Sequence, residues 1–178
     1  TVLGSIRKLK KFFFDMENEE LERFSSILKE AKQKIKKCKI CGNLTEEDIC
    51  EICSDDERDK KIICIVKDPR DIIAFEKSKT FNGLYHVLGG IIDPLNGVTV
   101  DDLDIGKLEN RLTSDIKEVI LALDPSLEGE TTSLYLSRII KEKNIKVSRI
   151  ASGIPMGGNI EFSDIATLSR SLEGRKEI

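Results

Sequence analysis

The stretch CKICGNLTEEDICEIC, residues 38–53, contains four of the chain's five cysteines in the spacing C-x2-C-x8-C-x2-C. Two thiolates three positions apart can hold one metal ion from a tight turn, and a second such pair completes a tetrahedron. The spacing therefore predicts a zinc ion. The predicted ligands are Cys38, Cys41, Cys50 and Cys53. Because four thiolates leave no position open for water or substrate, we expect a structural site, whose binding energy, on the order of 10 kcal/mol, would stabilise a segment with little core of its own.

Two disulfides are the competing interpretation of these cysteines. The chain shows no signal peptide and is rich in Lys and Glu, which disfavours an oxidising compartment. The fifth cysteine, Cys64, lies in the apolar run IICIV, so we expect it to be a core residue. Gly42 and Asn43 directly follow the first cysteine pair, where a metal-binding turn needs an adaptable backbone. These features favour zinc.

Composition sets the outer limits. A chain of 178 residues, 39% hydrophobic and 34% charged, can form one mid-sized domain with a small appendage, and no apolar stretch is long enough to span a bilayer. Residues 1–37 contain ten Lys and Arg against six Asp and Glu, a charge of +4. Because the whole chain has a net charge of −3, residues 38–178 carry −7. A solvated helix face and a phosphate-binding role are both open for this basic arm.

Hydrophobic periodicity predicts an alternation of strands and helices along the rest of the chain. Helices are expected at 18–37, 71–78, within 101–113, at 130–143 (with Leu134, Ile139 and Ile140 on the apolar side) and at 164–172 (with Ser163 as N-cap), and strands at 62–66, 84–88, 118–123 and 146–150. Strand and helix in alternation indicate an α/β domain with a parallel sheet. The only histidine, His86, falls inside a strand and is expected to be packed there.

The cysteine pairs and three longer stretches resemble the bacterial RecR family of recombination mediator proteins. These stretches are IICIVKDPRDIIAFEKSKTFNGLYHVLGGIIDPLNGV (62–98), EVILALDPSLEGETTSLYL (118–136) and VSRIASGIPMGGNIEFSDIATLSRSLEGR (147–175). The resemblance runs from about residue 38 to 175. It implies a partial helix-hairpin-helix in residues 1–37, a C4 zinc finger at 38–53, a Toprim-type parallel sheet flanked by helices at 60–155, and a C-terminal segment at 156–178 that forms an oligomer contact.

The N-terminal region fits the resemblance less closely. Similar proteins begin with a Gly-rich hairpin that contacts the DNA backbone, whereas TVLGSIRKLKKFFFDM offers only Gly4, so either the first helix is absent from this sequence or the motif is degenerate. Cations remain in the corresponding region. The expected DNA contacts are Arg7, Lys8, Lys10 and Lys11. Phosphate contacts of this kind give affinity without sequence preference and weaken steeply with salt.

The Toprim comparison argues against catalysis. Catalytic members have a Glu after the first strand as general acid or base and an Asp-x-Asp after the third that holds Mg2+. This chain has Lys67 where the Glu is expected. At the Asp-x-Asp motif it keeps Asp124 but has Ser126 in place of the second Asp. Loss of the proton-transfer group and of half the metal clamp removes the groups that promote phosphoryl transfer. Asp68 or Glu128 remain as substitutes in the alternative interpretation, a Mg2+-dependent Toprim enzyme acting on phosphodiester bonds.

The resemblance thus implies a non-catalytic mediator of recombinational DNA repair. Such a protein acts with RecO-type and RecF-type partners to load recombinase on single-stranded DNA at gaps, in the bacterial cytoplasm at the nucleoid, as a dimer or a ring-shaped homotetramer. Asp124 and Glu128 would dock the RecO-type partner, although Glu128 equally suits the N-terminus of its helix. A third interpretation is a pure protein-interaction module whose partner makes all DNA contacts.

Overall fold

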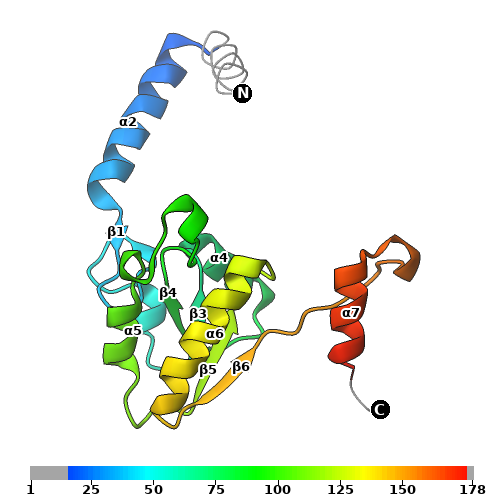
Figure 1. Ribbon diagram of the computed structural model, residues 1–178. Helices are drawn as coiled ribbons and strands as arrows, with labels where there is room; N and C mark the ends of the chain where they lie inside the picture. The colour runs from blue at the N-terminus through cyan, green and yellow to red at the C-terminus, as the bar shows by residue number, and fades with distance from the viewer. Residues whose placement is uncertain (1–15, 176–178) are drawn as a thin grey trace.

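The computed structural model describes residues 16–175. Its body consists of the cysteine-rich segment and a helix-flanked sheet, from which helix α2 and the C-terminal segment extend in different directions (Figure 1). From the N-terminus, the elements are α2 (Asn18–Lys34), β1 (Lys36–Lys37), β2 (Leu44–Thr45), α3 (Glu51–Ser54), β3 (Asp59–Val66), α4 (Pro69–Ser78), β4 (Gly83–Val87), η1 (Pro94–Asn96), η2 (Val100–Asp102), α5 (Ile105–Arg111), β5 (Glu118–Ala122), α6 (Leu127–Glu142), β6 (Lys146–Arg149), η3 (Ile160–Phe162) and α7 (Ile165–Glu173).

The main sheet has four strands in the order β4-β3-β5-β6, and every neighbouring pair is parallel. The predicted α/β fold with a parallel sheet is thereby confirmed. Strand β3 begins at Asp59, three residues earlier than the apolar run indicates, because Asp59 pairs with Gly83 across a register shift. Part of the stretch expected to be a polar connector is therefore strand.

Alternate side chains of the central strands fill two cores, one on each face of the sheet. Ile63 and Ile65 of β3 join Leu136 and Ile140 of α6 and the apolar residues of α5 on one face. Cys64 and Val66 point to the other face. Their partners there include Ile72 of α4, Tyr85 and Val87 of β4, and Ala122 of β5. The layers are thus α5 and α6, the sheet, and α4, and Cys64 is the core residue that its sequence context predicts.

Three details of the predicted helices are wrong. Helix α2 ends at Lys34, not Lys37, because the next residues pair with β2. Helix α7 is capped by Asp164 instead of Ser163, since the Asp164 carboxylate accepts a hydrogen bond from the Thr167 amide at 2.9 Å. Leu134 is 73% exposed, and the fully buried leucine of α6 is Leu136.

Helix α6 begins at Leu127, three residues before the expected start, because Ser126 provides an N-cap. Its Oγ accepts a hydrogen bond from the Gly129 amide at 3.1 Å. A Cβ atom at Gly129 would lie 2.0 Å from the Asp124 carbonyl oxygen, so only glycine lets the helix start this close to the end of β5. This close turn fixes where the carboxylates of the DPSLEGE stretch lie.

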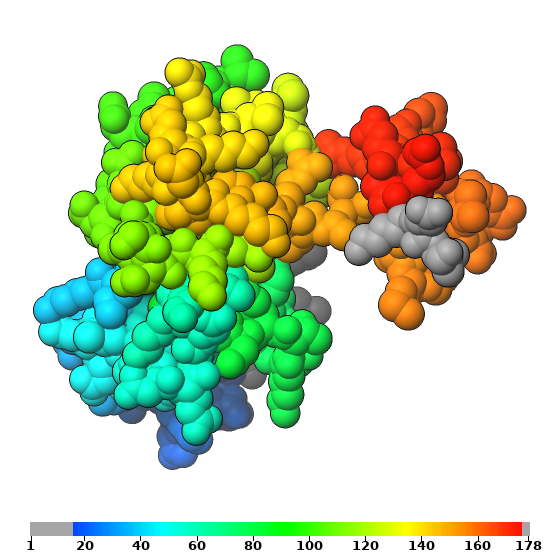
Figure 2. All heavy atoms as spheres, turned by 90° about the horizontal axis from the view of Figure 1, so that it is seen from below, coloured from blue at the N-terminus to red at the C-terminus, as the bar shows by residue number. Residues whose placement is uncertain are grey.

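Two segments lie outside the body. Helix α2 buries none of its described residues. The described part of the C-terminal segment, residues 156–175, is joined to the end of β6 by an extended stretch and stands beside the body in a space-filling view (Figure 2). Among residues 16–175, no helix combines the length and apolar character needed to cross a membrane.

Candidate functional site

The four expected zinc ligands come together. Cys38 and Cys41 lie between β1 and β2, whereas Cys50 directly precedes helix α3 and Cys53 lies within it. Their Sγ atoms all lie within 4.8 Å of one another, and three of the four residues are buried. Hydrogen bonds from backbone amides orient the sulfurs: Asn43 donates to Cys41 Sγ and Cys50 donates to Cys38 Sγ, both at 3.4 Å. The left-handed backbone of Gly42, with φ at +80°, makes the first turn possible.

The chemistry of this cluster fits zinc. The thiols crowd one another, so the hydrogen bonds that Cys50 accepts from Cys41 and Cys53 lower the pKa of Cys50. Its neighbours respond in the opposite direction: contact with Cys50 raises the pKa of Cys41 to about 12, and contact with Cys41 raises the pKa of Cys53. Without a cation, neighbouring thiolates repel one another. A divalent ion removes this conflict by taking the place of the protons, and soft thiolates in a closed tetrahedral set suit structural zinc.

The cysteine-rich segment is attached to the sheet at the end of β4. The Val87 amide donates a hydrogen bond to the Cys41 carbonyl oxygen at 2.8 Å. A Cβ atom at Gly42 would lie 3.3 Å from Val87 Cβ, so the two backbones meet closely. Ile52 of α3 packs both against the cysteines and against the α4-side core. A metal-binding turn and a sheet edge thus share one contact surface.

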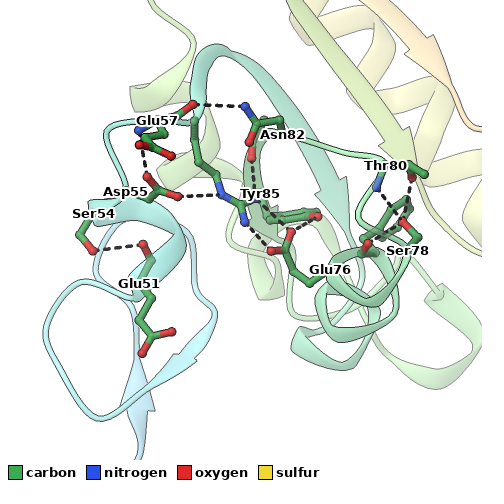
Figure 3. A network of polar contacts seen from close by, with 12 residues as sticks. Glu51, Ser54, Asp55, Glu57, Glu76, Ser78, Thr80, Asn82 and Tyr85 are labelled. Atoms are coloured by element: carbon green, nitrogen blue, oxygen red, sulfur yellow. Dashed lines mark hydrogen bonds and ion pairs between the residues drawn. The ribbon is translucent and has the colours of Figure 1, made fainter.

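Arg58 provides a second attachment through its ion pair with Glu76, and Figure 3 shows Glu76 beside Tyr85. The Arg58 side chain is only 12% exposed and forms an ion pair with Glu76 of α4, while its Nη1 also donates to the Gly83 carbonyl oxygen at 3.2 Å. Tyr85 donates its hydroxyl hydrogen to Glu76 at 2.7 Å. The bond from Arg58 lowers the pKa of Glu76, which keeps this carboxylate ionised inside the junction. The sequence analysis missed Arg58 because it lies in a run of charged residues.

His86 lies buried in β4, as predicted. One ring nitrogen, Nε2, is 2.9 Å from the Asp104 carbonyl oxygen, and Arg111 of α5 donates to the other, Nδ1, at 3.2 Å. Since Nδ1 accepts, the hydrogen lies on Nε2 and is donated to Asp104. Burial, assisted by Arg111, lowers the pKa of His86 to about 4, so the ring is neutral near pH 7.

Lys67 and Asp124 meet at the carboxyl edge of the sheet. The Lys67 Nζ atom lies 3.1 Å from an Asp124 carboxylate oxygen. These positions follow β3 and β5, the two strand ends at which the sequence analysis expected acidic groups to be replaced. An ammonium group therefore stands against the one carboxylate retained at this edge. Glu128 lies one turn further on, half-buried in the first turn of α6, and Asp124 is exposed.

Asp68 is committed to local structure. Its carboxylate caps α4 by accepting from the Arg70 amide at 2.7 Å and binds the Arg70 side chain, while Asp71 completes the capping box. The hydrogen bond from the Arg70 side chain lowers the pKa of Asp68, so the group is held as a carboxylate. A carboxylate held in this way is poorly suited to donate a proton as a general acid.

Glu130 ties the C-terminal segment to the sheet. It forms ion pairs with Arg149 at the end of β6 and with Arg170 of α7, the latter at 3.3 Å. Arg170 also donates to the Pro125 carbonyl oxygen at 3.2 Å. A hollow of about 440 Å³ lies between this cluster and the segment, with Asp124 in its lining. No sequence signal identified these arginines, because each is one charged residue among many.

The proposed DNA contacts cannot be placed. Arg7, Lys8, Lys10 and Lys11 lie outside the described residues, so their role remains a sequence-based prediction. The described residues of α2 continue the charged character of the N-terminal region, with basic residues in the last turn at Lys32 and Lys34.

Comparison with known proteins agrees with this geometry. The Toprim domain profile matches residues 61–151, the profile of the RecR four-cysteine zinc finger domain matches residues 35–55, and the RecR C-terminal profile matches residues 153–176. A recombination protein RecR from Clostridium perfringens is 47% identical over 174 residues, covering 98% of this chain and 88% of that relative. Another, from Tropheryma whipplei, is 48% identical over 169 residues, covering 93% of this chain and 85% of the relative. The matched profiles coincide with the cysteine cluster, the parallel sheet and the C-terminal segment.

Proposed function

Because the chain belongs to the RecR family of recombination proteins, with its zinc finger and Toprim domain, we propose that it is a non-catalytic, DNA-binding mediator of recombinational DNA repair. It would act in the bacterial cytoplasm at the nucleoid, together with RecO-type and RecF-type partners, to load recombinase on single-stranded DNA at gaps. Zinc is structural in this assignment, since the four-cysteine cluster has no open position.

The ion pair between Lys67 and Asp124 carries the non-catalytic part of the proposal. Metal-assisted phosphoryl transfer needs carboxylates that hold Mg2+ and a group that moves a proton. At this edge, Asp124 is paired with an ammonium group, and Asp68 is engaged by Arg70 and by its helix. Both carboxylates therefore already have a partner, and the ammonium group of Lys67 would repel a metal ion at Asp124. These contacts favour a mediator over the alternative Mg2+-dependent Toprim enzyme.

DNA binding is assigned to Arg7, Lys8, Lys10 and Lys11. The charge of +4 on residues 1–37, within a chain of net charge −3, supports this placement. In a homo-oligomer, symmetry repeats the basic arm, so a ring could direct several arms at one duplex while its acidic surface faces partners. Asp124 and Glu128 are assigned to docking of the RecO-type partner, which suits carboxylates on an exposed edge.

The C-terminal segment, residues 156–178, is assigned to contacts between subunits, next to a Toprim domain at 60–155 and a zinc finger at 38–53. Its described part presents large apolar side chains to solvent. The most exposed are Met156, Ile160, Phe162, Ile165 and Leu172, each at least 67% exposed. A segment that buries so few of its own apolar groups gains stability by burying them against another subunit.

Charge reversal tests the proposal. The double variant Lys10→Glu and Lys11→Glu should weaken DNA binding and reduce the dependence of log affinity on log salt by about two, since each phosphate contact contributes about one to that slope. A matched control, Lys77→Glu with Lys141→Glu, makes the same charge change on exposed positions of the body and should leave the slope unchanged. Equal losses in both variants would point to nonspecific charge and overturn the assignment.

The enzymatic alternative has its own test. Incubation of DNA with the protein and Mg2+ should give no strand cleavage. Cleavage that depends on Mg2+ and disappears in Asp124→Asn would establish a Toprim enzyme and contradict the proposal. The interaction-module interpretation predicts a third result. Neither the unmodified protein nor the charge-reversed variant would bind DNA alone, and binding would appear only when the RecO-type protein is added.

A further inference from the structure

Arg111, the last residue of α5, has a buried guanidinium at the junction between the zinc finger and the sheet. Its Nη1 donates to the Tyr85 carbonyl oxygen at 2.6 Å and to His86 Nδ1 at 3.2 Å. Both acceptors lie on β4, directly before Val87, whose amide holds the Cys41 carbonyl oxygen. The side chain of a Toprim helix thus reaches the strand end on which the metal-binding turn rests.

The other guanidinium nitrogen, Nη2, is buried and makes no hydrogen bond within the described part of the chain. Burying a positive charge whose hydrogen-bond donors are not all paired costs free energy, so a negative charge is expected close to it. Within residues 16–175, no carboxylate forms an ion pair with Arg111, and the strand end that its Nη1 atom binds is the one that holds the cysteine turn through Val87.

Zinc bound by four thiolates carries a net charge of about −2, since the ion contributes two positive charges and each sulfur one negative charge. Three of the four ligands are buried, so water screens little of this charge. The lysines next to the turn do not compensate it. Lys36 and Lys39 both pair with Asp48 at 2.6 Å, on the exposed side of the segment.

We propose that Arg111 is the cation that balances the four-thiolate zinc centre and that its bond to Tyr85 couples metal binding to the sheet. Arginine suits this role because its planar fork serves two directions at once. Nη1 is fixed on β4, and Nη2 has no other hydrogen-bond partner within the described residues. Arg111 acts as a positioning residue, since it reaches the metal through its ligands. This role goes beyond the proposed mediator function and does not depend on DNA binding.

Three variants of the full-length zinc protein test the role. Arg111→Met removes the charge at similar length, Arg111→Lys keeps the charge but loses the fork, and Arg58→Met breaks the other buried attachment. Arg58 is a matched control, because it faces Glu76 and Asp55 instead of the cysteines. Zinc affinity is measured by competition with a chromophoric chelator, and the free energy of unfolding is measured by urea on the same samples.

Arg111→Met should lose about 10- to 100-fold in zinc affinity, the range for groups that support metal ligands. Arg111→Lys should recover most of that loss. Arg58→Met should also lower the free energy of unfolding. For an equal loss of stability, it should reduce zinc affinity less than Arg111→Met does. Replacing zinc by Co2+ adds a spectroscopic readout: removing a cation near the sulfurs should shift the sulfur-to-cobalt charge-transfer band to lower energy in Arg111→Met and not in Arg58→Met.

Two outcomes would overturn the proposal. One is equal zinc affinity in Arg111→Met and the unmodified protein. The other is an equal loss in Arg111→Lys and Arg111→Met without a band shift, which would reduce Arg111 to a structural hydrogen-bond donor. If Arg111→Met does not fold, the affinity and band position of Arg111→Lys against Arg58→Met still decide, because only the proposed role predicts near-normal values for the lysine.

Discussion

The two junctions of the Toprim body are built in different ways. On one side, the zinc finger is attached through buried groups: the backbone bond between Val87 and Cys41, and two arginines, Arg58 and Arg111, with little exposure to solvent. On the other side, the C-terminal segment is tied by half-buried ion pairs from Glu130, and its apolar side chains face outward.

The difference indicates which parts form one rigid unit. Buried polar contacts are strong because water competes little for them, whereas ion pairs that water still reaches contribute about 0–1 kcal/mol. We therefore expect the zinc finger and the sheet to unfold together, and the C-terminal segment to change position at low cost. Such a segment is suited to exchange its contacts for those of another subunit.

Loss of zinc should have the largest effect. Cys50→Ser, or chelation of the metal, removes binding energy on the order of 10 kcal/mol and should unfold residues 36–57. Hydrogen exchange should rise there and in β4, while α7 keeps its exchange rates. Cys64→Ser is the matched control, because Cys64 is buried in the sheet away from the metal, and this variant should still bind one zinc ion. Equal exchange in both junctions after chelation would contradict the contrast.

Acidification should weaken the zinc-finger junction through His86. Its folded pKa is about 4, below the unfolded value of about 6.5, so unfolded chains bind more protons as the pH falls between these values. The contribution of neutral His86 is complete above pH 6.5 and should decrease by about 2 kcal/mol between pH 7 and pH 5. Urea unfolding with excess zinc measures this loss.

The variant His86→Gln checks the assignment. Glutamine stays neutral over this range and can still accept a hydrogen bond from Arg111. The variant should therefore not show the loss of about 2 kcal/mol that neutral His86 causes between pH 7 and pH 5. A pH dependence unchanged by the substitution would assign the effect to other groups.

Two glycines with the same backbone conformation offer a smaller test. Gly42 has φ of +80° and lies against Val87, whereas Gly157 has φ of +79° with nothing within 4 Å of its missing side chain. Alanine at either position costs about 1 kcal/mol for the left-handed conformation. Gly42→Ala should cost about 1 kcal/mol more, because Val87 must move, and should lower the unfolding temperature of the body. Gly157→Ala should leave that temperature unchanged, as measured by circular dichroism.

The smallest effect is expected at the second junction. Glu130→Gln should change the free energy of unfolding by less than about 1 kcal/mol, yet raise hydrogen exchange in α7 several-fold, because Arg170 loses its carboxylate. Arg138→Gln breaks an exposed pair with Glu142 elsewhere on α6 and serves as the control. A loss of several kcal/mol in Glu130→Gln would show that the two junctions are equally strong.

Much of the architecture could be predicted from local patterns. The C-x2-C pairs identify the metal ligands because both members of a pair lie in one turn, and the apolar runs identify β3, β4 and β5 because these strands are buried on both faces. Helix ends were less predictable. Ser163 and Asp164 are both capable N-caps, and the backbone geometry that selects Asp164 is not encoded by residue type alone.

Residue types and their spacing were enough to identify the zinc ligands, the α/β alternation and the replacement of the expected acidic residues by Lys67 and Ser126. Which charged residues are buried, and what they bind, became visible once the elements were packed together. Arg58 and Arg111 look like surface residues in the sequence, and Leu134 looks like a core residue. The physical reason is that burial depends on elements distant in the chain, so a guanidinium is enclosed only when a zinc finger, a strand and a helix meet around it.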